Sequence, residues 1–217
     1  ARIFNINIEC RINYSAVIGG IKLKTFFRRD SRKTRREKSI NNTEERKTVS
    51  GFVHLHLHSG YSLLDGACRI NEIAEAAARE GHCAVALTDH GAMYGAVEFY
   101  RACKAAEVKP IIGCEVYVAP KSRFDRDPAA KYNHLVLLVE NEIGYRNLCR
   151  MVSLSFTEGF YSKPRVDYEL LTEYSEGLIA LSGCLGGIVP SMILASDFDG
   201  ALREAERLRD IFGKDSF

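Results

Sequence analysis

From residue 52 onward, short apolar runs alternate with stretches in which apolar residues recur every three or four positions. The runs are rich in Val, Ile and Leu, and they predict buried strands at 84–87, 111–119, 134–140 and 178–183. Residues 52–57 ("FVHLHL") instead alternate between apolar and polar side chains, which predicts a strand that is covered on one face.

The stretches between these runs predict helices. Ile70, Ile73, Ala74 and Ala77 form one apolar stripe, and Gly81 ends that helix. Further helices are predicted at 96–106, 145–155, 168–174, 188–194 and 200–212. Strands that largely alternate with helices indicate an α/β fold with a mostly parallel sheet, either closed as a barrel or open.

Residues 1–50 differ in composition from the rest of the chain. They are rich in charged residues, Ser, Thr and Asn, so we expect a disordered extension that the remainder does not need for folding. The extension is basic, because residues 1–47 carry a net charge of +8 and residues 48–217 carry −6, within the total of +2. The acidic body argues against a broad surface that wraps nucleic acid, although not against a substrate held through metal ions.

An uncharged run at 178–196 is long enough to raise the question of a membrane span. Gly183, Gly187 and Pro190 interrupt it, so we expect a strand, a turn and a helix there, and no membrane association. The seven cysteines never occur in C-x-x-C spacing, which is typical of thiols in a reducing cytosol, and a cytoplasmic location is expected.

The segment "FVHLHLHSGYSLLDG" (52–66) carries the first candidate chemistry. On a strand, His54, His56 and His58 would share one face, and Asp65 follows within the next turn. Imidazole and carboxylate ligands suit a divalent metal ion such as zinc or manganese. The alternative is a solvated polar face of an edge strand.

Further candidates lie next to the predicted strands, where parallel α/β folds place functional groups. Each has a structural alternative as a helix cap, a rim residue or a small buried side chain. They are Asp89, His90, Glu115, His134 and Cys184. One ion needs only about three or four protein ligands, so this many candidates predicts two or three ions, as in enzymes that hydrolyse phosphate esters. The charged loop "PKSRFDRDPAAKY" adds Arg123 and Arg126 as candidate phosphate contacts.

Several motifs resemble one family. "HLHLHSGYSLLDG", "ALTDHGAMYGAVEFYRACKAAEVKPIIGCEVYVAP", "EGFYSKPRVDYELL" and "EGLIALSGCLGG" are similar to the PHP (polymerase and histidinol phosphatase) domain of bacterial DNA polymerase III alpha subunits. The resemblance covers residues 51–217 with the motifs in unbroken order.

The resemblance implies a distorted (β/α)7 barrel with a centre of up to three zinc or manganese ions. It assigns seven metal ligands: His56, His58, Asp65, His90, Glu115, His134 and Cys184. It leaves His54 and Asp89 as neighbours of the ligands. The last two ligands of the family, an Asp and a His of a later strand, have no counterpart, so we expect the domain at 51–217 to be incomplete at its carboxyl end.

The resemblance also implies a function, with two roles open for this part of the chain. One is phosphodiester hydrolysis of the 3′–5′ exonuclease type, and the other is a structural or docking module of the polymerase. A free-standing phosphoesterase, such as a histidinol phosphatase, is a third alternative. The whole protein would be a magnesium-dependent DNA polymerase that works on DNA with a sliding clamp and a proofreading subunit.

Overall fold

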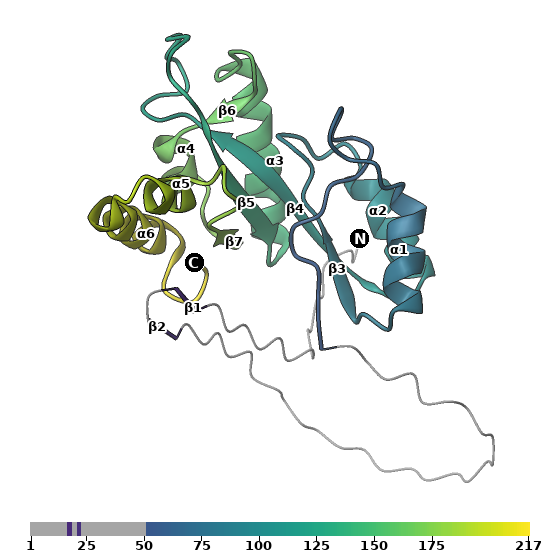
Figure 1. The fold of residues 1–217 in the computed structure, drawn as a ribbon. Coiled ribbons are helices and arrows are strands. Elements are labelled where there is room, and N and C mark those ends of the chain that lie inside the picture. Colours follow the sequence, from purple (N-terminus) through teal and green to yellow (C-terminus); the bar gives the residue numbers. More distant parts are fainter. Residues whose placement is uncertain (1–16, 19–20, 23–50) are drawn as a thin grey trace, which may run out of the picture.

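The computed structural model describes residues 17–18, 21–22 and 51–217 (Figure 1). The predicted disordered extension at 1–50 therefore lies outside the described residues, apart from two short strands. These are β1 (Val17–Ile18) and β2 (Ile21–Lys22), which pair antiparallel.

The rest of the described chain is built on a five-stranded mixed sheet. Four strands lie side by side in the order β3-β4-β5-β7, and β6 pairs with β4. Their bounds are β3 Ala84–Leu87, β4 Lys109–Val118, β5 Asn133–Val139, β6 Arg165–Val166 and β7 Leu178–Leu181. Four of them confirm the strands predicted from the apolar runs, whereas the two-residue β6 was not predicted.

The prediction of a mostly parallel sheet is wrong for half of its pairings. β3–β4 and β4–β6 are parallel, but β4–β5 and β5–β7 are antiparallel. No helix lies between β4 and β5, and a connection without a crossover helix favours antiparallel pairing.

All six predicted helices are present, with ends within three residues of those predicted. They are α1 Ile70–Arg79, α2 Ala96–Ala105, α3 Glu142–Thr157, α4 Tyr168–Glu173, α5 Ile188–Leu194 and α6 Phe198–Phe212. The starts of α3, α4 and α6 are fixed by local chemistry, because the side chains of Asn141, Asp167 and Asp197 accept hydrogen bonds from backbone N–H groups of the first turn. No helix in the described part is long and apolar enough to cross a membrane.

The helices cover one face of the sheet and leave the site on the other. Cys114, Val116 and Val118 of β4 are buried in one core cluster with residues of α3, α4 and α6. α1 and α2 pack beside β3 in a second cluster (Figure 1). Because side chains alternate along a strand, Glu115 and Tyr117 point to the opposite face of β4. A small apolar cluster of Ala86, Val136 and Leu138 supports that face next to the site.

The predicted strand at 52–57 is not a regular strand. It lies along β3, where Ala86 N–H donates to His54 O (2.8 Å) and Thr88 N–H donates to Leu57 O (2.8 Å). The two bonded positions are three residues apart on this segment and two residues apart on β3. The segment therefore carries one extra residue, as in a β-bulge, and the chain bends at His56. One extra residue reverses the facing of the side chains that follow it, so His54 does not share a face with His56 and His58.

Candidate metal centre

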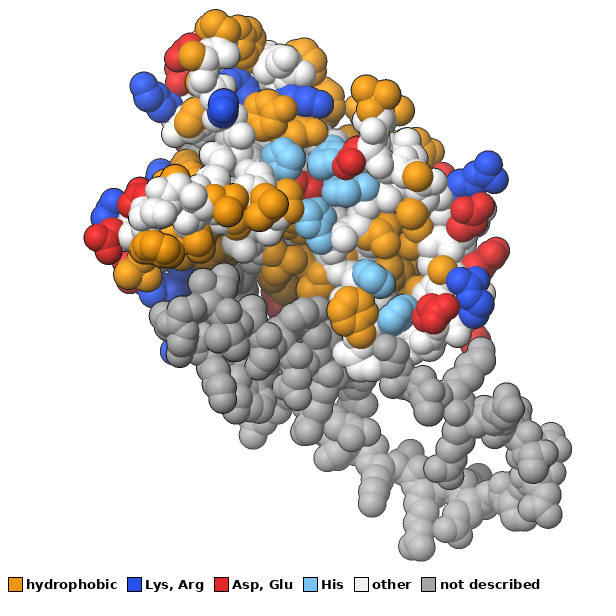
Figure 2. Space-filling view, in the orientation of Figure 1, with side chains coloured by type: hydrophobic (Ala, Val, Ile, Leu, Met, Phe, Trp, Pro, Cys, Tyr) orange, Lys and Arg blue, Asp and Glu red, His pale blue; other side chains and the backbone are white. Residues whose placement is uncertain are grey.

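The sheet brings side chains from four segments to one edge. His90 follows β3, and Glu115 lies near the end of β4. His134 lies at the start of β5, opposite Tyr117 of β4, and reaches the same edge because β5 runs antiparallel. His56 and His58 come from the segment before α1. Four of the six histidines therefore gather on one face of the molecule (Figure 2).

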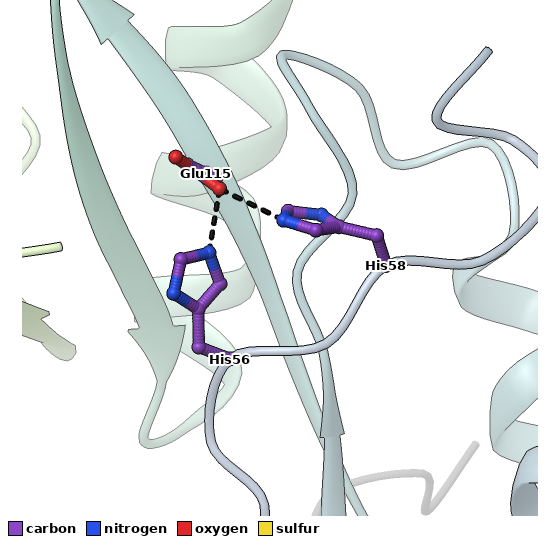
Figure 3. Close-up of side chains that lie close together, drawn as sticks. All are labelled: His56, His58 and Glu115. Atoms are coloured by element: carbon purple, nitrogen blue, oxygen red, sulfur yellow. Dashed lines mark hydrogen bonds and ion pairs between the residues drawn. The ribbon is translucent and has the colours of Figure 1, made fainter. Parts of the chain in front are cut away.

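Glu115 is the centre of this group. Its side chain is 1% exposed, although it stands in an otherwise apolar strand. His56 Nε2 lies 2.5 Å and His58 Nε2 lies 3.0 Å from its Oε2 (Figure 3). His134 Nδ1 contacts the other oxygen, Oε1, and His90 Nδ1 lies 3.5 Å from Oε2. One buried carboxylate thus faces four imidazoles.

Asp65 joins the group through His90. Its Oδ2 lies 2.6 Å from His90 Nε2, and the hydrogen bond from His90 lowers the pKa of the Asp65 carboxyl. Asp65 lies on an exposed loop, at the outer rim of the site.

Asp89 does not touch the imidazoles but holds the loop that precedes Asp65. The buried carboxylate accepts hydrogen bonds from Ser59 N–H (2.7 Å), Ser59 O–H (2.8 Å) and Ser62 O–H (2.7 Å). Ser62 Oγ in turn accepts from the backbone N–H of His90 (3.0 Å). Sequence reasoning missed both serines, because Asp89 lies 30 residues from Ser59 and 27 from Ser62 along the chain and leaves no local signal.

The donor atoms fit divalent metal ions. Ligand atoms form three overlapping trios, each with its atoms within 4.8 Å of one another. The trios are His56–His58–Glu115, His58–Asp65–His90 and His90–Glu115–His134. Nδ1 of His58, His90 and His134 and Oε1 of Glu115 are buried and make no hydrogen bond in the described part of the chain. His134 Nδ1 and Glu115 Oε1 are in contact but are not hydrogen-bonded to each other. Such orphaned buried atoms are costly unless a cation satisfies them.

The electrostatics of the group keep Glu115 charged. Burial raises the pKa of its carboxyl, but the close contacts with His134, His56 and His58 outweigh burial, and the pKa lies far below the usual range. The contact with Glu115 also raises the pKa of His58. Burial of His58 lowers this pKa, but the effect of Glu115 is larger. The centre therefore favours the ionised form of a carboxylate that is surrounded by imidazoles.

Two predicted residues stand apart from this group. His54 is exposed and packs its ring against Phe52 (4.8 Å) and His82 (5.4 Å), away from Glu115. Cys184 is an exposed free thiol on the loop after β7 and belongs to none of the three trios. Its loop is nevertheless tied to the site, because His134 N–H donates to Gly186 O (2.9 Å).

The two arginines proposed as phosphate contacts are engaged elsewhere. Arg123 is buried, and its guanidinium pairs with Glu158 (2.7 Å), Asp167 (3.0 Å) and Glu169 (3.0 Å). Three carboxylates leave this guanidinium without a free face for a phosphate. Arg126 is exposed, but it donates to the carbonyl oxygens of Arg123 (2.9 Å) and Glu158 (3.1 Å). Both side chains anchor the loop between β4 and β5.

The chain matches a known family. A family model of the PHP domain matches residues 54–217, and the chain belongs to this family. All six clustered ligands lie inside the matched range.

Individual relatives are more specific. The chain is 50% identical over 169 residues to the DNA polymerase III subunit alpha of Treponema pallidum, which covers 76% of this chain and 14% of the relative. It is 47% identical over 171 residues to the corresponding subunit of Borreliella burgdorferi, covering 77% of this chain and 15% of the relative. The chain thus spans about one seventh of the length of these relatives. A solved amidohydrolase from Chromobacterium violaceum aligns with 74% of this chain and 53% of the amidohydrolase chain, at 22% identity and a TM-score of 0.36. This structural similarity is too weak to assign a function.

Proposed function

We propose that residues 51–217 are the PHP domain of a DNA polymerase III alpha subunit and that the histidine–glutamate centre binds two or three zinc or manganese ions for phosphodiester hydrolysis. The observation that carries the proposal is the overlap of the three trios. His58, His90 and Glu115 each belong to two of them, so neighbouring ions would share ligands. Shared ligands place ions close together, the arrangement used to act on phosphate esters.

The residues present have distinct tasks in this proposal. Bound ions would lower the pKa of water and stabilise negative charge on the phosphodiester oxygens. Glu115 supplies the buried charge, and both of its oxygens face imidazoles. Asp65, at the exposed rim, is the ligand nearest to where a substrate would arrive. Cys184 would join the ligand set through a movement of its loop, and His54 and Asp89 would act only by holding the backbone.

The substrate we favour is the 3′ end of single-stranded DNA. The similarity to polymerase subunits favours a nucleic acid over a small phosphate monoester, which places a histidinol phosphatase second. The rest of the polymerase setting belongs to the same proposal. It comprises a magnesium-dependent DNA polymerase, a sliding clamp, a proofreading subunit, a cytoplasmic location and a complete (β/α)7 barrel.

A 3′-end removal assay tests the activity. The chain is stripped of metal, reloaded with manganese and given a single-stranded oligonucleotide labelled at its 5′ end. We expect stepwise shortening from the 3′ end that depends on manganese and falls at least roughly a hundredfold in His58→Ala, because one ligand serves two trios. His82→Ala, a histidine outside the centre, is the matched control and should keep the wild-type rate.

The competing structural role predicts a different result. If the chain holds manganese with a stoichiometry of at least one, yet shortens no oligonucleotide, the centre serves stability or docking and the hydrolytic proposal is wrong.

A further inference from the structure

A tight turn between α3 and β6 carries Lys163, which forms no ion pair with any described residue, beside the metal centre. Tyr161 N–H donates to Lys163 O (3.1 Å), and Ser162 between them has a φ of 65°. A non-glycine residue in this left-handed region is strained, and such strain persists only where surrounding contacts fix the backbone. The turn is therefore held in one shape.

The turn sends its two long side chains in different directions. The ring of Tyr161 lies against the guanidinium groups of Arg165 (5.3 Å) and Arg126 (5.9 Å). Lys163 instead places its Nζ 5.3 Å from the centre of the Tyr117 ring. Lys163 thus points toward the face of the sheet that carries the site.

Tyr117 connects this lysine with the metal ligands. Its ring stacks on His90 (6.0 Å between ring centres) and meets His134 edge-on (5.3 Å). Tyr117 is 5% exposed, so it forms the floor of the site next to these two imidazoles, with Lys163 above it. The ammonium group is therefore within reach of a group bound beside His90 and His134.

The backbone after Lys163 is locked to the backbone after His90. A side chain at Gly91 (φ 60°) would meet Pro164 Cγ and Tyr117 Cε2, each at 2.9 Å, so only glycine allows this approach. Pro164 is buried in the contact. The position of Lys163 relative to His90 is thus set by packing.

Within the described part of the chain, the Tyr117 ring is the neighbour of the Lys163 ammonium group, and this group forms no ion pair. No carboxylate of the described residues pairs with it, in contrast to Arg123, which has three. A lysine next to bound divalent ions would be repelled by them, unless an anion lies between the two. Lysine is a compact point charge that binds phosphate oxygens well.

We propose that Lys163 binds the phosphate group of the substrate, on the side of the centre formed by His90 and His134. This proposal rests on the proposed function, because it requires a phosphate at the same metal centre. It gives the site the cationic phosphate contact for which Arg123 and Arg126 are not available.

Binding of inorganic phosphate to the manganese-loaded chain tests this role without turnover. Isothermal titration calorimetry should show phosphate binding to the wild type and binding weaker by roughly tenfold in Lys163→Gln, the effect of losing one charge-assisted hydrogen bond. Lys163→Arg should retain most of the affinity. Lys104→Gln, which removes an exposed lysine on α2, is the matched control and should not change it.

Manganese content, measured on the same samples, separates the outcomes. It should be equal in all four chains, because Lys163 is not a metal ligand. Equal phosphate affinity in Lys163→Gln and wild type would overturn the role of Lys163 and leave the hydrolytic proposal standing. A manganese loss in Lys163→Gln would also overturn it, by showing a structural role. Failure of the loaded wild type to bind phosphate would instead count against the proposed function itself.

Discussion

Glu115 explains most of the site at the scale of single residues. A carboxylate in the middle of a buried strand would normally destabilise the fold, and here four imidazoles surround it. The arrangement makes sense when cations lie between these groups, because otherwise several buried nitrogens have no partner in the described chain. Glu115 is therefore the residue whose charge should matter most for metal binding.

Glu115→Gln keeps the shape of the side chain and removes its charge. Loss of a residue that only supports a metal ligand typically weakens metal binding by roughly 10–100-fold. Because Glu115 is proposed as a direct ligand, we expect the affinity for zinc or manganese to fall by at least this factor. Metal content after gel filtration, measured by mass spectrometry, should drop by at least one ion per chain. Glu140→Gln changes an exposed carboxylate just after β5 and should have no effect. Full metal content in Glu115→Gln would contradict the central role of this carboxylate.

Lys109, at the start of β4, should make the free energy of unfolding depend on pH. Its Nζ is buried without a hydrogen-bond partner in the described chain, and burial lowers the pKa of this lysine to about 8. Between pH 8 and about 10.5, the unfolded chain holds a proton that the folded chain has released, so the free energy of unfolding should rise with pH. Urea unfolding should show this rise in the wild type and in the exposed control Lys104→Met, but not in Lys109→Met. Parallel profiles for all three chains would contradict it.

At the scale of elements, the pattern of apolar residues predicted most strands and every helix. Burial of one face determines the spacing of apolar residues along a helix and along a strand. The direction of β5 could not be predicted in this way, since a buried strand has the same pattern whether it runs parallel or antiparallel. His134 shows the consequence: it stands at the start of its strand, and the antiparallel pairing brings this end to the site.

Two details of the candidate site escaped prediction for related reasons. The bend at His56 separates His54 from the other histidines, and nothing in the alternation of "FVHLHL" marks the extra residue. Arg123 looked free in a charged loop because its partners, Glu158 and Asp167, are more than thirty residues away in sequence. Long-range pairing of charges has no local signature.

The ion pair between Arg123 and Asp167 anchors the loop between β4 and β5 to the start of α4. The side chains of Arg123 and Asp167 are 9% and 3% exposed, and Asp167 also caps α4 through Leu170 N–H (3.2 Å). Arg123→Met would leave this carboxylate buried without a cation, so we expect a loss of about 3–5 kcal/mol in the free energy of unfolding. Arg126→Met, in the same loop, should cost less than about 1 kcal/mol because its side chain is exposed. Chemical denaturation of both variants checks this, and similar losses would mean that the buried pair is not the anchor.

At the scale of the whole molecule, the centre lies where two halves of the described chain meet. The cluster around α1, α2 and β3 is separate from the cluster around α3, α4 and α6. The parallel pairing of β3 with β4 joins them in one sheet, and the six candidate ligands come from both sides of this connection. An ion held by His56 and His58 on one side and by Glu115 on the other would cross-link the halves, as would an ion held by His90, Glu115 and His134.

Metal removal should therefore lower the stability of the whole chain. A ligand that binds only the folded state adds about 2.7 kcal/mol at a concentration of a hundred times its Kd, and this corresponds to a rise of roughly 5–10 °C in Tm for a domain of this size. Scanning calorimetry of the chain treated with EDTA, and of the same chain reloaded with manganese, should show this difference. His58→Ala, which breaks two of the trios, should lose most of it, whereas His82→Ala should keep it. If stripped and loaded wild type unfold at the same temperature while manganese is bound stoichiometrically, the ions do not join the two halves, and the ligand geometry described above needs another explanation.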